Sequence, residues 1–99
     1  MAGPHVWIKN VPAPWEAASF DTAALPGNNE KVIFCDRGIG DVISSLNQTA
    51  VDLDLLEIQD TYPGSIGADG NPLIISSDVV LYNGTGTMFY QDGGGTTDL

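Results

Sequence analysis

The sequence is poor in positive charge. Its 99 residues contain 3 Lys and Arg against 13 Asp and Glu, which gives a formal net charge of −10 at pH 7. The cations are Lys9, Lys31 and Arg37, too few to neutralise the several phosphates of a nucleic-acid backbone. The same imbalance opposes attraction to anionic lipid. Sequence-general nucleic-acid binding and binding to an anionic membrane surface are therefore disfavoured, and we expect neither kind of partner.

Cysteine and histidine occur once each. Cys35 excludes an internal disulfide and an all-cysteine metal site, and its place in the apolar run Val32–Cys35 predicts a small buried side chain. His5 lies in a proline-rich segment, where we expect an exposed or interface histidine rather than the base of a catalytic triad. No cofactor, no metal and no enzymatic activity are expected.

Long apolar runs are also missing. None approaches the ~20 residues that cross a bilayer, and the first residues lack the basic and apolar regions of a secretory signal. We therefore expect a soluble protein made in a cytoplasm.

Glycine and proline are abundant, with 12 and 6 residues, and they divide a single domain into three parts. Residues 1–29 hold four prolines and are predicted to form an extended N-terminal arm, with residues 15–24 as a short helix candidate. Residues 30–90 are predicted to form a β core. Residues 91–99 are a glycine-rich C-terminal tail.

The β core is predicted from short runs of branched and aromatic residues between turn sequences. In residues 53–59 the alternation of apolar and polar residues changes phase at Leu55 and Leu56, which a strand accommodates with a bulge or a bend. Tyr82 and Tyr90 flank the turn at residues 83–86 and are expected to pair across a hairpin. The predicted strands are residues 31–36, 41–46 (a strand or one helical turn), 53–59, 72–76, 78–82 and 87–90.

The spacing of these runs leaves two all-β architectures open. The earlier apolar centres are about 20 residues apart, as in the turns of a short parallel β-solenoid. The later centres are about 8 residues apart, as in the hairpins of a compact sandwich or barrel-like fold. No clear tandem repeat decides between them.

The sequence contains only weak signals for a metal site or a cofactor site. Asp52, Asp54 and Asp69 supply oxygen ligands of the kind that calcium prefers, but the spacing of an EF-hand is missing and alternating aspartates are typical of a solvated strand face. The sequence Gly38-Ile39-Gly40 resembles the start of a dinucleotide-binding fingerprint, but the third glycine and the helix that should follow are missing.

The most promising residues for partner binding lie at the two ends of the chain. Trp7 and Trp15 are large anchors of the kind that dominate protein interfaces; the alternative is that both cover the open end of the β core. The partner-binding residues predicted in the arm and the tail are Val6, Trp7, Ile8, Trp15, Gln91, Thr96 and Leu99.

Several short patterns occur along residues 7–82: Trp7 and Trp15 in a proline-rich lead, Pro26-Gly27 ahead of residues 30–34, Gly40-Asp41-Val42 with Leu46, and Gly64-Ser65-Ile66-Gly67 before Asn71-Pro72-Leu73. In these features the chain resembles β-rich surface proteins of tailed bacteriophages, in particular small capsid decoration (cement) proteins, and is similar to the openings of β-helical surface proteins. The resemblance implies an accessory protein on the capsid exterior of a virion.

The resulting hypothesis is a non-enzymatic structural protein that stabilises contacts between major capsid subunits. Its partners would be the major capsid protein and neighbouring copies of itself in a large symmetric assembly. An acidic exterior suits such an outer position. The alternative is a carbohydrate-binding or adhesin-like β-solenoid module, with exposed aromatics and loop Asn and Asp residues as its working parts.

Overall fold

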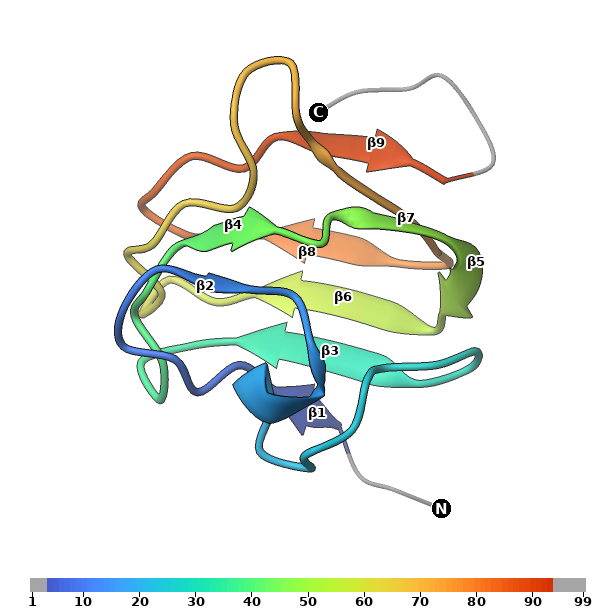
Figure 1. The fold of residues 1–99 in the computed structure, drawn as a ribbon, viewed down its shortest axis with the longest axis horizontal. Coiled ribbons are helices and arrows are strands. Elements are labelled where there is room, and N and C mark those ends of the chain that lie inside the picture. Colours follow the sequence, from blue (N-terminus) through green and yellow to red (C-terminus); the bar gives the residue numbers. More distant parts are fainter. Residues whose placement is uncertain (1–3, 94–99) are drawn as a thin grey trace.

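The chain coils into a parallel β-solenoid of about three turns (Figure 1). The computed structural model describes residues 4–93. Neighbouring strands come from successive turns and run parallel, in three sheets with the orders β1-β3-β6-β8, β2-β4 and β5-β7-β9. The strands are β1 (His5–Val6), β2 (Ala13–Pro14), β3 (Lys31–Phe34), β4 (Val42–Ser44), β5 (Asn47–Leu53), β6 (Leu55–Ile58), β7 (Leu73–Ser77), β8 (Val80–Tyr82) and β9 (Tyr90–Asp92).

A repeat of 24 residues holds the first sheet in register. Val32, Leu56 and Val80 pair across β3, β6 and β8 at this spacing, and Val32 and Leu56 are fully buried. Phe34 and Ile58 pair in the same way two residues later. Because alternate residues of a strand point to one face, the pairs stack as columns inside the coil. The all-β prediction is confirmed, and the solenoid is the architecture of the two that is present.

The short spacings of about 8 residues are steps between sheets rather than hairpins. Val42 of β4, Ile66 and Met88 are joined by parallel bridges, which continue the β2-β4 sheet on a second side of the coil. Tyr82 lies in β8 and Tyr90 in β9, which belong to different sheets. The predicted cross-hairpin pair of Tyr82 and Tyr90 is therefore wrong.

The phase change near Leu55 marks a corner of the solenoid. Asp54 separates β5 from β6, and its backbone N–H donates to the Glu30 carbonyl at 2.9 Å. Leu53 before the corner and Leu56 after it are both fully buried. The chain turns from one sheet to the next here, so the alternation of inward-facing and outward-facing residues starts again after the corner. Residues 53–59 are two strands of different sheets, not one bulged strand.

The N-terminal region packs on the coil instead of extending from it. β1 pairs with β3 and β2 with β4. The prolines of this region are compatible with these short strands, because a strand at the edge of a sheet accepts proline. Where a helix was expected over residues 15–24, the structure has only a 3₁₀-helix, η1, at Ala17–Ser19. Within residues 4–93 no helix has the length and apolar character needed to cross a membrane.

Glycines at one corner allow successive turns to approach closely. The residues Gly40, Gly64 and Gly86 precede the bridged positions by two residues each. A Cβ at Gly40 would overlap the Val11 backbone, and one at Gly86 would overlap the Gly64 carbonyl. The Gly38-Ile39-Gly40 sequence therefore serves close backbone packing rather than phosphate binding.

We predict that Gly40→Ala lowers the free energy of unfolding by about 3 kcal/mol, because the backbone of the neighbouring turn must move. Gly70→Ala is the control. Its Cβ would meet no atom within 4 Å at φ +80°, so only the left-handed conformation costs energy, about 1 kcal/mol. Urea denaturation of both variants measures the difference, and equal losses would contradict the close-packed corner.

Candidate functional site

The N-terminal end of the solenoid is closed by aromatic rings. Trp7 stacks on Phe34 with ring centroids 5.4 Å apart, and Trp15 meets Phe20 edge-on at 5.0 Å. Tyr62 packs against Phe34 at 5.1 Å and donates its hydroxyl to the Gly40 carbonyl at 2.6 Å. Burial raises the pKa of Tyr62 well above its usual range, so the phenol remains a neutral donor.

These contacts place both tryptophans in the core. Trp7 has 0% of its surface exposed and donates from Nε1 to the Gly40 carbonyl at 3.2 Å. Trp15 is also buried, and its Nε1 has no hydrogen-bond partner among the described residues. The tryptophans thus cover the end of the β core, and in this fold their side chains are not accessible to a partner.

The other predicted partner-binding residues are divided between the two ends. Val6 is buried in β1, and Ile8, two residues later, is half-buried. Gln91 lies half-buried in β9, in the last turn. Thr96 and Leu99 lie outside the described residues.

The edge of β1 is covered by the chain itself. The backbone N–H of Ile8 donates to the Ser19 carbonyl at 3.0 Å, and that of Asp21 donates to the Val6 carbonyl at 2.9 Å. The Asp21 carboxylate also accepts from the Val6 N–H at 3.0 Å. The segment around Phe20 therefore pairs antiparallel with β1 and occupies the hydrogen-bonding groups that an outer strand presents to other chains.

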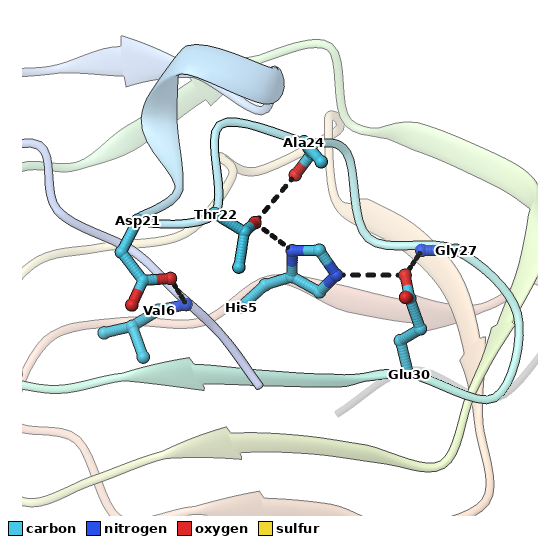
Figure 2. Close-up of polar contacts among 7 residues, drawn as sticks. All are labelled: His5, Val6, Asp21, Thr22, Ala24, Gly27 and Glu30. Carbon is cyan, nitrogen blue, oxygen red and sulfur yellow. Dashed lines mark hydrogen bonds and ion pairs between the residues drawn. The ribbon is translucent and has the colours of Figure 1, made fainter. Parts of the chain in front are cut away.

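A polar network lies beside this cover (Figure 2). His5 Nδ1 is 2.5 Å from the Thr22 hydroxyl, and His5 Nε2 is 2.9 Å from Glu30 Oε1. Glu30 Oε1 also accepts from the Gly27 N–H at 2.6 Å. The Gly27 and His5 hydrogen bonds hold the pKa of Glu30 below its usual range, because both favour the carboxylate.

The network contains the hydroxyl, imidazole and carboxylate of a catalytic relay, but its geometry is that of a structural cross-link. We call the contacts of His5 with Thr22 and Glu30 the clasp. His5 is 1% exposed, and both of its ring nitrogens are occupied. The Thr22 hydroxyl is also within 3.4 Å of the Ala24 carbonyl. The contacts tie β1 to the loop before β3, so the expectation of an exposed His5 is corrected. Because its partners are 17 and 25 residues away, no local motif in the sequence indicates them.

We predict that Glu30→Gln destabilises the protein at pH 7 and that the loss of stability becomes smaller toward pH 3. The lowered pKa means that ionised Glu30 stabilises the fold above its unfolded-state pKa of about 4.3. That stabilisation is lost as the pH falls through the folded-state pKa. Thermal midpoints at the two pH values measure the gap between the two proteins, and a gap of equal size at both would contradict the clasp. Glu16→Gln, at an exposed position, is the control.

The C-terminal end differs because β8 is the last strand of its sheet. Within residues 4–93 no strand pairs with its outer edge. Large apolar side chains are exposed along this strand and its approach: Val79 at 45%, Leu81 at 45% and Tyr82 at 38%. Residues Val79–Tyr82 are called the β8 edge below. An unpaired apolar strand edge is a surface that accepts another strand.

Two hollows lie in this half of the molecule, each with a volume of about 500 Å³. The first lies between the loop after Ile66 and the start of β9, and it is lined by Ala68, Asp69, Gly70, Pro72, Phe89, Tyr90 and Gln91. The second lies beside the ends of β6 and β8, and it is lined by Glu57, Gln59, Asp60 and Asn83. Sequence reasoning identified neither, because each joins residues from different turns.

Charge is distributed unevenly between the two ends. The three cations all lie within the first 37 residues, whereas residues 38–99 contain no Lys, Arg or His. That later part carries nine acidic residues: Asp41, Asp52, Asp54, Glu57, Asp60, Asp69, Asp78, Asp92 and Asp98. This asymmetry is visible in the sequence and is the signal that could have pointed to the C-terminal end.

The remaining candidates from the sequence do not form a site. In the described part of the chain no group of three or more His, Cys, Asp or Glu side chains is arranged to hold a metal ion. Cys35 is half-exposed rather than buried, because it follows the inward-facing Phe34 and so falls on the outward phase.

Comparisons of the chain with models of protein families, with curated proteins and with solved structures found no match.

Proposed function

We propose that the chain is a non-enzymatic binding module that attaches to a larger protein assembly through the open end of its solenoid. One observation carries the proposal: the β8 edge exposes Val79, Leu81 and Tyr82 beside a strand that lacks an outer neighbour in residues 4–93. At the opposite end, the segment around Phe20 covers β1. A module closed at one end and open at the other adds to a partner in one direction.

The setting we favour is the exterior of a viral capsid, where the chain acts as a decoration protein that bridges major capsid subunits. A net charge of −10 supports an outer position, because the packaged nucleic acid repels an acidic protein. Many symmetric copies on a capsid also strengthen weak individual contacts through avidity. The buried tryptophans move the proposed contact from the N-terminal region to the β8 edge.

We predict that changing Val79 and Leu81 together to Ser weakens attachment at least tenfold. Each buried aliphatic side chain contributes about 1.5–3 kcal/mol, and a factor of ten requires about 1.4 kcal/mol. The assay is co-sedimentation with capsids of the virus that carries the gene, after mild heating has released the native protein.

The matched control changes Val11 and Ile43 to Ser. These side chains are 63% and 53% exposed but lie away from the β8 edge, so attachment should not change. Equal binding by the β8-edge variant and the wild type would rule out docking through this edge. Purified particles without any copy of the chain would rule out the capsid setting.

A second candidate function is carbohydrate binding in the hollow beside β9. Its lining includes the Phe89 ring and the exposed Asp69, and sugars bind where an apolar ring and fixed polar groups meet. We predict that Phe89→Ala abolishes any saturable signal on a glycan array, whereas Val11→Ala leaves it intact. The absence of a signal from the wild-type protein would remove this candidate.

A further inference from the structure

We infer that the β8 edge receives an extended, positively charged segment of the partner protein as the next strand of the sheet. The inference rests on the proposed function and adds the chemistry of the partner. It is carried by three features: the backbone groups at the edge, the side chains around them and the acidic hollow at the end of β8.

The backbone of β8 offers a place for one more strand. The Leu56 N–H donates to the Val79 carbonyl, and the Asn83 N–H donates to the Ile58 carbonyl. Because strand groups alternate in direction, Leu81 also faces β6, and the N–H and C=O groups of Val80 and Tyr82 face outward. Across the described residues no strand takes up this side of β8.

The side chains at the edge require an apolar cover. Val80 and Tyr82 stand in register with the buried Leu56 and Ile58, so they continue the inner columns of the coil. No strand of residues 4–93 lies above them, and Val80 remains half-buried while Tyr82 is exposed. An added strand with apolar residues at alternate positions would extend both columns by one layer.

The charge around the edge selects a cationic strand. Glu57 pairs with Leu81 on the outer face of the sheet, and Glu57 and Asp60 line the hollow beside Asn83, the residue that follows β8. A residue added opposite Leu81 would lie two strand spacings from Glu57, about 10 Å. A Lys or Arg side chain reaches across that distance with its apolar stem over Leu81.

The same charge argues against a second copy as the occupant. Each copy carries a net charge of −10 and has no cation after Arg37. Two β8 edges would therefore bring acidic residues against acidic residues, which opposes pairing. The edge accepts a basic partner and discourages association of the protein with itself.

The test uses the full chain and a capped synthetic peptide of alternating lysine and valine, with binding measured by calorimetry. We expect saturable binding that weakens at least tenfold when salt rises from about 50 mM to about 500 mM, together with slower amide exchange at Val80 and Tyr82. A peptide with glutamate in place of lysine, and one N-methylated along the edge that pairs, should not bind.

Variants of the chain locate the interaction. Changing Glu57 and Asp60 to Gln and Asn should weaken peptide binding at least tenfold. The control removes the same amount of charge at exposed positions elsewhere, through Glu16→Gln and Asp52→Asn, and should bind nearly as the wild type does. Equal losses in the two variants would show a general charge effect and overturn the inference.

Other occupants give different results. Dimerisation that rises with protein concentration and is lost in Leu81→Ser would make a second copy the occupant. Peptide binding that appears only after deletion of residues 94–99 would make the chain's own C-terminal segment the occupant. Either result overturns the basic-strand inference.

The inference and the proposed function can fail separately. If the Val79 and Leu81 variant loses capsid attachment while the Glu57 and Asp60 variant and high salt leave it intact, docking stands and the cationic strand is wrong. If attachment does not depend on the β8 edge at all, the proposed function is wrong, and the inference that rests on it is wrong as well.

Discussion

The parallel register between turns is the constraint on which the other features of this protein depend. Leu56 is held between Val32 and Val80, and each step is 24 residues. A slip of one residue would turn these side chains from the core to the solvent. The register also brings Gly40 and Gly64 to the same corner, where the turns approach too closely for a Cβ. The register of the strands, the stacking of the core residues and the close approach of the turns at the glycine corner therefore depend on one another.

Much of this fold can be predicted from the sequence, but the repeat is obscured. Runs of branched residues locate β3, β6 and β7, and the sequences Gly40-Asp41-Val42, Gly64-Ser65-Ile66 and Gly86-Thr87-Met88 mark equivalent corners. The last step between corners is two residues shorter than the first, and the pairing of β5 with β7 contains a register shift. A search for one fixed period therefore misses them.

The candidate sites are less predictable because their members are joined only by the coil. His5 is tied to Glu30 across 25 residues, and Glu57 meets Asn83 at one hollow only because β6 and β8 are neighbours. Composition misleads in the N-terminal region, where prolines indicate an extended arm. Burial of Trp7 and Trp15 outweighs that tendency, because large aromatic rings gain most from leaving water.

The two ends of the solenoid meet the same problem in different ways. Each sheet of a short solenoid has two outer strands with a side that no neighbouring turn pairs, and exposed backbone groups of this kind promote aggregation. At β1 the chain supplies its own cover through Ser19 and Asp21. At β8 the described chain supplies no covering strand, but Glu57 and Asp60 lie beside its end and no cation follows Arg37 in the sequence. In the arrangement we infer, repulsion between acidic copies keeps the edge from pairing with itself, whereas an oppositely charged strand is attracted to it.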